Sequence, residues 1–223
     1  MIHYHCADIH PLTKFLGLEG RHLLVSHAYP RRVKEAHRIG QSVLLDNGAF
    51  SVWRSSAIAN WDAYYEWCDQ WFHAPTTWAI IPDVIDAGPE AQDNLLAQWP
   101  HGERGAPVWH TDEPLDRLLR LVADWPRVCV GSSSKHQIGT DNWRRIIDKA
   151  FNALSRRNAR LAWLHGLRMQ SVSSEYPFGS VDSADVARNN NRKQNSVKSL
   201  CERWDKIQPP VWVQRPEQRE LLE

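Results

Sequence analysis

Short apolar runs alternate with helical patterns along almost the whole chain, and this alternation restricts the possible folds more than any other feature. Eight runs have the continuous apolar character of strands covered on both faces. They are residues 2–6, 23–26, 42–46, 78–81, 107–110, 127–131, 161–165 and 178–181. Eight βα units in 223 residues predict an α/β fold, a single (β/α)8 barrel of the TIM type. The alternative is an open doubly wound sheet, which the absence of a glycine-rich phosphate turn after the first run disfavours.

Helical patterns fill most of the gaps between these runs. The expected helices are residues 30–39, 60–72, 89–99, 113–125 and 141–156, the second capped by Asn60. The connection 165–178 is short and rich in serine, so this helical unit is expected to be eroded to a loop or a single turn. Residues 184–207 predict one polar terminal helix, followed by an apolar tail strapped across the barrel. We therefore expect a barrel domain, 1–190, with a C-terminal helix and tail, 191–223, packed on it.

Composition and charge exclude several classes of protein. The chain has no apolar run long enough for a membrane helix and does not begin like a signal peptide. Its four cysteines are far apart and form no CxxC pair, which favours reduced thiols and a cytoplasmic location, the host cytoplasm if the chain is encoded by a phage. The net charge of +1 hides an asymmetry, because residues 141–223 carry 15 Lys and Arg against 10 Asp and Glu. This basic third either meets phosphates or forms solvated helix faces.

Three aspartates stand at or near the ends of apolar runs. Asp46, Asp83 and Asp182 each follow such a run. The carboxyl ends of barrel strands share one rim, where barrel enzymes hold their catalytic groups. Carboxylates that converge repel one another and are costly to desolvate, so a chain that repeats the arrangement is expected to use them. Taken singly, each aspartate is also consistent with a turn or a helix cap.

Other residues at the expected rim suit a flat ligand. Phe50 could cover an aromatic ring, and Asp83 could accept hydrogen bonds from the N–H edge of a purine-like base. Gly131 and Ser132 leave room and backbone N–H groups for a phosphate or a carbonyl, although a plain loop is equally consistent. Asp182 could attack the anomeric carbon of a sugar and displace a base.

Histidines at the strand ends allow two interpretations. His110 and His165 are expected at the same rim, more as residues of the pocket wall than as catalysts. A metal centre is the alternative, because His3 and His5 have HxH spacing and could join His110 and Asp182 in a metal-dependent hydrolase.

At these residues the chain resembles the tRNA-guanine transglycosylase superfamily, and most of all its compact DNA-guanine transglycosylases from phages and bacteria, which insert 7-deazaguanines into DNA. The similar segments occur in the order of the family and cover roughly residues 23–190. They are Leu45-Asp46-Asn47-Gly48-Ala49-Phe50-Ser51, Ile81-Pro82-Asp83-Val84, Pro107-Val108-Trp109-His110, Val130-Gly131-Ser132, Leu164-His165-Gly166-Leu167-Arg168 and Ser180-Val181-Asp182-Ser183.

The resemblance implies a pentosyltransferase that exchanges guanine in nucleic acid for a 7-deazaguanine. It implies that Asp182 is the nucleophile that forms a covalent glycosyl–enzyme link and that Asp46 is the acid/base. It further assigns Phe50 to stacking on the base and Asp83 to its N–H edge. The remaining assignments place four residues at the base and one at a phosphate. They are His110, where the tRNA enzymes have Gln, Gly131 and Ser132 on the carbonyl side, His165 at the pocket wall, and Arg188 at the phosphate.

The chain also departs from the family. The zinc module CxCxxC…H is missing, as is an appended RNA-binding domain, and Asn47 and Ala49 replace the usual Ser and Gly. These differences favour DNA over tRNA as a partner, together with the free 7-deazaguanine base, and imply no metal or other cofactor. Partner proteins or a homo-oligomer are possible. The alternatives to base exchange are an N-glycosidase, the metal-dependent hydrolase, and an accessory nucleic-acid-binding barrel without turnover.

Overall fold

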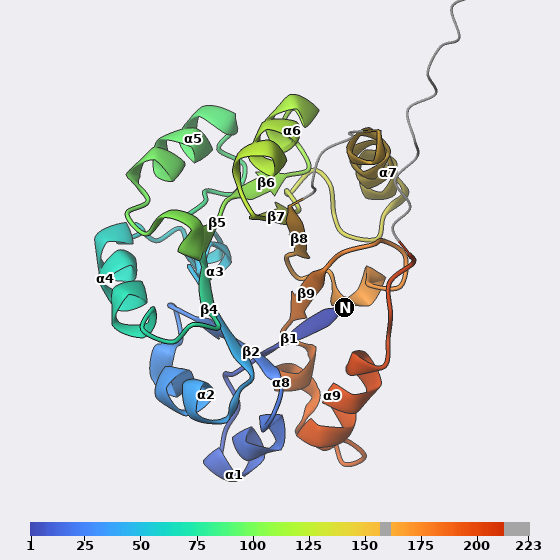
Figure 1. Cartoon of the computed structure of the whole chain (residues 1–223). Helices are drawn as coiled ribbons and strands as arrows, with labels where there is room; N and C mark the ends of the chain where they lie inside the picture. Colours follow the sequence, from blue (N-terminus) through green and yellow to red (C-terminus); the bar gives the residue numbers. More distant parts are fainter. Residues whose placement is uncertain (157–161, 212–223) are drawn as a thin grey trace, which may run out of the picture.

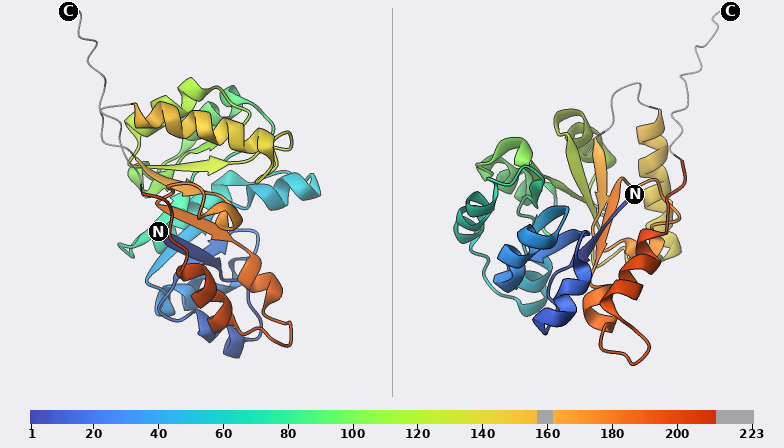
Figure 2. Two further views of the ribbon diagram at one scale, coloured as in Figure 1. Left: turned by 90° about the vertical axis from the view of Figure 1, so that its right-hand side faces the viewer. Right: turned by 60° about the horizontal axis from the view of Figure 1, so that its bottom comes forward.

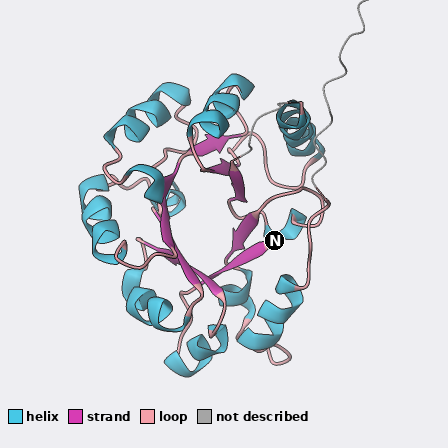
Figure 3. Cartoon of the chain, viewed as in Figure 1, coloured by secondary structure: helices cyan, strands magenta, loops and turns pink. Residues whose placement is uncertain are grey.

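The strands form a closed ring surrounded by helices (Figure 1 and Figure 3). The computed structural model describes residues 1–156 and 162–211. In this part of the chain, nine parallel strands form one sheet in the order β5-β4-β3-β2-β1-β9-β8-β7-β6. They are β1 (Ile2–Cys6), β2 (His22–Ser26), β3 (Ser42–Asp46), β4 (Thr77–Ile80), β5 (Gly105–Ala106), β6 (Val108–His110), β7 (Arg127–Gly131), β8 (Trp163–Gly166) and β9 (Ser180–Ser183). The predicted α/β barrel is therefore confirmed.

The ninth strand, β5, lies just before the predicted strand 107–110, and Pro107 separates it from β6. β5 and β6 lie at the two ends of the sheet order, yet they adjoin in sequence on either side of Pro107. β5 pairs with β4, and β6 pairs with β7. Pro107 has no amide to donate, but its carbonyl accepts from Cys129 N at 2.8 Å. The segment 105–110 thus closes the barrel by contacting both neighbours in turn.

The helices follow the sequence pattern in most units. Within the described residues they are α1 (Leu12–Phe15), α2 (Val33–Ile39), α3 (Ala49–Ser55), α4 (Trp61–Trp71), α5 (Pro89–Gln98), α6 (Leu115–Asp124), α7 (Asp141–Ser155), α8 (Asp185–Asn189) and α9 (Val197–Asp205). The predicted cap is present, because the Asn60 side chain accepts from Ala63 N at 3.1 Å. The predicted erosion between β8 and β9 is also confirmed, since a 3-10 turn, Gln170–Val172, replaces the helix there.

Helix α3 was not predicted, and one helical prediction is wrong. α3 begins directly after β3, because Asn47 Oδ1 accepts from Ala49 N at 2.8 Å and Gly48 adopts a positive φ of 78°. The single helix expected over 184–207 is two helices. Asn190 Nδ2 donates to the carbonyls of Val186 and Ala187. These hydrogen bonds satisfy backbone carbonyl groups in the last turn of α8, and the helix ends there. A Ser196–Ser199 capping box then starts α9.

The apolar core lies partly inside the ring and partly between the ring and the helices. The interior is filled by inward-facing side chains of the strands. They are Tyr4, Leu24, Leu44, Trp78, Ile80, Ala106, Val108 and Cys129. Because these bulky residues fill the barrel, the carboxyl ends of the strands form the walls of a pocket above a solid floor.

α9 packs beside β1 at the amino end of the barrel (Figure 2). Leu200 and Cys201 are buried in the same cluster as Phe15 and Leu18. Asp205, at the end of the helix, forms an ion pair with His5 Nε2 at 2.9 Å. The predicted tail strap falls largely on residues 212–223, outside the described residues, and the division at residue 190 stays a prediction. In the described part of the chain, no helix is long and apolar enough to span a membrane.

Candidate functional site

One pocket of ≈ 660 Å³ opens at the carboxyl ends of the strands. Its volume is in the range of small-molecule sites, which is about 300–1,000 Å³. Eight of the nine residues singled out in the sequence line it. They are Asp46, Phe50, Asp83, His110, Gly131, Ser132, Asp182 and Arg188. The structure therefore brings together side chains from five strands or the loops that follow them.

The strand register explains why these residues converge. Asp46 pairs with Ser26 on β2, and Asp182 pairs with Tyr4 on β1. Leu44 and Tyr4 face the barrel interior. Because strand side chains alternate with a period of two, Asp46 points to the same side as Leu44, one step further up the barrel. The aspartates thus form a polar layer above the apolar floor.

Asp46 is the acid whose protonation is most perturbed. Burial raises its pKa, and the negative charges of Asp182 and Asp83 raise it further, to about 7. Hydrogen bonds from the Ser26 hydroxyl and the Gly48 amide oppose this rise without cancelling it. Asp46 can therefore both accept and donate a proton near neutral pH.

Asp182 is held by the loop that follows β8. Its Oδ1 accepts from the Arg168 backbone amide at 2.8 Å, and Arg168 adopts a positive φ of 60° there. His165 Nε2 lies 3.3 Å from the same oxygen. The bond to the amide fixes the direction of the carboxylate.

His165 does not line the pocket, so its predicted place on the pocket wall is wrong. The ring is fully buried inside the barrel, where it meets the edges of Tyr4 and Trp78. Its Nδ1 is 2.8 Å from the Ser180 hydroxyl. His165 lies below Asp182 because it belongs to the barrel interior, and it supports that carboxylate from beneath.

Asp83 is buried at the pocket wall and is fixed by two donors. Asn47 Nδ2 donates to Asp83 Oδ1 at 2.8 Å and also to the Ile81 carbonyl at 2.9 Å. His110 Nε2 lies 3.0 Å from Asp83 Oδ2. Each carboxylate oxygen has two lone pairs, so Asp83 keeps acceptor capacity toward the pocket.

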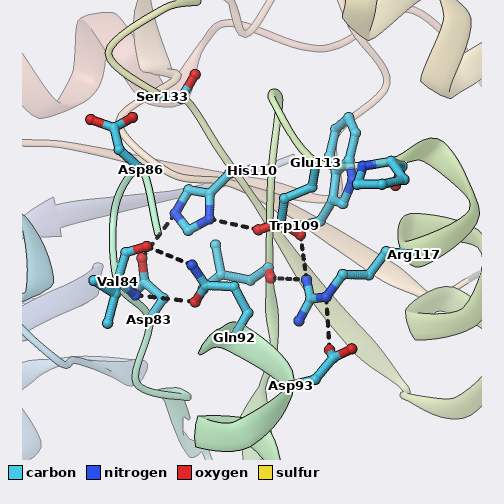
Figure 4. A network of polar contacts seen from close by, with 12 residues as sticks. Asp83, Val84, Asp86, Gln92, Asp93, Trp109, His110, Glu113, Arg117 and Ser133 are labelled. Carbon is cyan, nitrogen blue, oxygen red and sulfur yellow. Dashed lines mark hydrogen bonds and ion pairs between the residues drawn. The ribbon is translucent and has the colours of Figure 1, made fainter. Parts of the chain in front are cut away.

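His110 continues into a buried polar network behind the pocket (Figure 4). Its Nδ1 is 3.0 Å from Glu113 Oε1, and Arg117 Nη1 donates to Glu113 Oε2 at 2.7 Å. Burial by itself lowers the pKa of His110, but the hydrogen bonds and charges of Asp83 and Glu113 outweigh it and raise the pKa to about 10. His110 is therefore a cation at neutral pH, and both of its ring nitrogens are engaged.

The Phe50 ring at the pocket is already covered on one face. The Arg168 guanidinium lies over the Phe50 ring, with Cζ 3.8 Å from the ring centroid. Arg188, on α8, is exposed at the rim. Within the described residues, neither guanidinium takes part in a hydrogen bond or an ion pair. The mouth of the pocket thus presents two unpaired positive charges.

Gly131 is a glycine for a steric reason. A Cβ at this position would lie 2.8 Å from His110 Cδ2 and 3.2 Å from Val108 Cγ1. Ser132 follows at the pocket wall, half-buried. The absence of a side chain at Gly131 is what lets His110 reach Asp83.

The residues proposed for a metal centre do not meet. His3 Nε2 contacts the Ile207 carbonyl at 3.2 Å, and His5 Nε2 contacts Asp205 at 2.9 Å. Both histidines point outward to the C-terminal segment, because they alternate with the inward-facing Tyr4. In the part of the chain that the structure describes, no group of three or more His, Cys, Asp or Glu side chains is arranged to hold a metal ion.

Three residues of the site were missed in the sequence. Asn47 was noted only as a departure from the family and as part of a turn, but it holds Asp83. Arg117 lies on the apolar stripe of α6, four residues after Glu113. This i, i+4 spacing of opposite charges on a buried face could have been recognised in the sequence as an ion pair. Arg168 gave no comparable signal, because its role depends on a loop conformation.

In comparisons with protein-family models, with curated proteins and with solved structures, nothing matches this chain. The site must therefore be interpreted from its own chemistry.

Proposed function

We propose that the protein is a base-exchange glycosyltransferase that replaces guanine in nucleic acid, DNA rather than tRNA, with a 7-deazaguanine. One observation carries the proposal: three aspartates from separate strands line one pocket in three different environments. Asp46 has a pKa near 7, Asp182 is held by a backbone amide, and Asp83 is fixed by Asn47 and His110. Such differences assign different tasks to otherwise identical groups.

Asp182 is the nucleophile in this proposal. Its free oxygen attacks C1′ of the target nucleotide, the new C–O bond forms, and the C–N bond to guanine breaks with its electron pair going to the base. Asp46, in its protonated form, supplies the proton that neutralises the leaving guanine. The incoming 7-deazaguanine then loses a proton to Asp46 and attacks C1′, which releases Asp182 as a carboxylate. A pKa of about 7 lets Asp46 perform both proton transfers without a large barrier.

Base recognition falls to the wall and the rim. Asp83 offers acceptor oxygens for the N–H edge of the base, and Phe50 offers a ring for stacking. Gly131 and Ser132 stand on the side assigned to the carbonyl. In this proposal the target nucleotide leaves the stack to enter the pocket, and Arg188, exposed at the rim, contacts the backbone phosphate beside it.

The decisive test measures exchange directly. Guanine-containing DNA is incubated with the protein and labelled guanine, and the label in the DNA is counted. Base exchange incorporates label, whereas an N-glycosidase leaves abasic sites without label. Exchange by the wild type that is lost in Asp182→Asn supports the proposal, since the amide preserves size but is a poor nucleophile.

A second measurement separates the enzyme from an accessory barrel. Asp182→Asn should still bind DNA but should form no covalent adduct on denaturing gels. DNA binding without exchange or adduct in the wild type would overturn the proposal in favour of the accessory interpretation.

A further inference from the structure

A chain of charged side chains runs from the pocket wall to the protein surface (Figure 4). It passes from Asp83 through His110 and Glu113 to Arg117, with contacts of 3.0, 3.0 and 2.7 Å. Arg117 Nε then donates to Asp93 Oδ1 at 2.8 Å. The side chains of His110, Glu113 and Arg117 are at most 3% exposed, whereas that of Asp93 is 46% exposed. The chain is thus buried along its length and anchored to solvent at one end.

The chemistry of the contacts fixes the charge of His110. A carboxylate accepts hydrogen bonds when ionised, so a ring with a carboxylate at each nitrogen must donate from both. That form is the imidazolium. Arg117 balances Glu113 and also donates from Nη1 to the Val108 carbonyl at 2.7 Å, which locks its position. Two buried anions therefore alternate with two buried cations, the arrangement that makes such burial tolerable.

The same contacts decide what the pocket wall can offer a ligand. Both N–H groups of His110 are used, one by Asp83 and one by Glu113, so His110 has none left for a ligand. Asp83 accepts hydrogen bonds from His110 and Asn47, so it also faces the ligand as an acceptor. Asn47 Nδ2 donates to Asp83 and to the Ile81 carbonyl, so its N–H groups are also occupied. These three side chains consequently form an acceptor-only wall.

We propose that Glu113 and Arg117 are positioning residues that act through His110 to hold the Asp83 carboxylate in place as a hydrogen-bond acceptor, so that this wall selects a heterocycle edge carrying N–H donors. The inference rests on the proposed base exchange and adds its specificity filter. A guanine-type edge places N–H groups against Asp83. An adenine-type ring nitrogen there would set an acceptor against a carboxylate and would itself be buried without a donor, which is strongly disfavoured.

The first test measures the charge of His110 without any substrate. The full chain is labelled with ¹⁵N histidine, and the His110 ring is followed by NMR as the pH rises. The wild-type ring should stay protonated beyond pH 9, since its pKa is raised to about 10. In Glu113→Gln, which removes one of the two carboxylates, it should lose its proton at a pH lower by about two to three units, below about pH 8.5. Glu113→Asp, which keeps the charge, should restore most of the shift. An unchanged His110 titration in Glu113→Gln would overturn the inference.

The second test measures base binding by calorimetry with free guanine and free adenine. Binding is compared at about pH 6 and about pH 8.5, so that His110 of the variant is charged at one pH and neutral at the other. Glu113→Gln should lose guanine affinity about 10- to 100-fold at the higher pH and recover most of it at the lower. The guanine affinity of the wild type should change less between the two pH values, because only Asp46 titrates between them. The variant also contains Asp46, so this smaller change is common to both proteins. The preference for guanine over adenine should narrow in Glu113→Gln at the higher pH.

A matched control is available away from the pocket. Glu175→Gln breaks the exposed pair with Arg144, which measures 2.8 Å, and should leave guanine binding unchanged at both pH values. An equal loss of affinity at both pH values in Glu113→Gln would indicate a merely structural role and would overturn the inference. Failure of the wild type to bind guanine would instead count against the proposed function itself, so the two failures can be told apart.

Discussion

The guanidinium of Arg168 covers the ring of Phe50, with Cζ 3.8 Å from the ring centroid. A flat base that stacks on this face of Phe50 must first displace a cation–π contact, which is worth about 0.5–2 kcal/mol. The arginine therefore competes with the ligand for the ring.

Substitutions at these two residues should change base affinity in opposite directions. Phe50→Leu removes the stacking surface and should weaken guanine binding about 5- to 100-fold. Arg168→Ala uncovers the Phe50 ring and should strengthen guanine binding by up to about 10-fold. The backbone amide that binds Asp182 is kept in this variant. Isothermal titration of both variants checks this. Weaker binding in Arg168→Ala would show that the guanidinium instead holds the ligand.

Asp46 should give the protein a pH-dependent stability. The pKa of Asp46 is raised from 3.8 to about 7 in the folded state, so the folded protein binds this proton more tightly than the unfolded chain does. The resulting contribution to stability is complete below about pH 4 and is lost as the pH rises through 7. Asp46→Asn should therefore be more stable than the wild type at pH 8, by an amount on the order of a few kcal/mol. Urea unfolding between about pH 4.5 and 8.5 measures the difference. The exposed Asp62→Asn serves as the control, and parallel profiles for wild type and Asp46→Asn would contradict the prediction.

Gly131 should tolerate no side chain. In Gly131→Ala the new Cβ meets His110 at 2.8 Å, so the ring must move away from Asp83 or the strand must shift. We expect a loss of stability of about 1–3 kcal/mol and a weaker guanine affinity. Ser132→Ala, at the next position, should stay within about 0.5 kcal/mol of the wild type. Denaturant unfolding and calorimetry on both variants decide between these outcomes.

Arg188 should contribute one phosphate contact. Arg188→Ala should weaken DNA binding and reduce the slope of log K against log salt by about 0.9. Arg144→Ala is the matched control, since Arg144 is also exposed in the basic third of the chain but is paired with Glu175. Fluorescence anisotropy at several salt concentrations measures both slopes. An unaltered slope in Arg188→Ala would remove this residue from the phosphate contacts.

Much of the barrel could be predicted from the sequence, because apolar periodicity reports burial directly. Strands such as Ile2–Cys6 and Ser42–Asp46 match their predicted bounds. The errors occur where side chains bond to nearby backbone. Asn47 starts α3 and Asn190 ends α8 through contacts that depend on a conformation, not on a hydrophobic pattern.

The candidate site was predictable as a set of residues but not as a network. Parallel strands carry their ends to one rim, so Asp46, Asp83 and Asp182 could be placed together from spacing alone. The direction of each side chain within that rim depends on the register and on local packing. His165 was placed one layer too high for this reason, and His110 was assigned to the ligand although both of its nitrogens are committed to carboxylates.

The break between β5 and β6 at Pro107 also leaves a seam in the barrel with few hydrogen bonds. The ladder lacks an amide there, and only two residues on one side and three on the other join the neighbouring strands. Strands that are joined by few hydrogen bonds open readily, so we expect early hydrogen exchange at this seam, as at the equally short pairing of β8 with β9. His110 lies on β6, beside the seam. Local opening of the barrel at this place would therefore loosen the His110 side of the pocket wall.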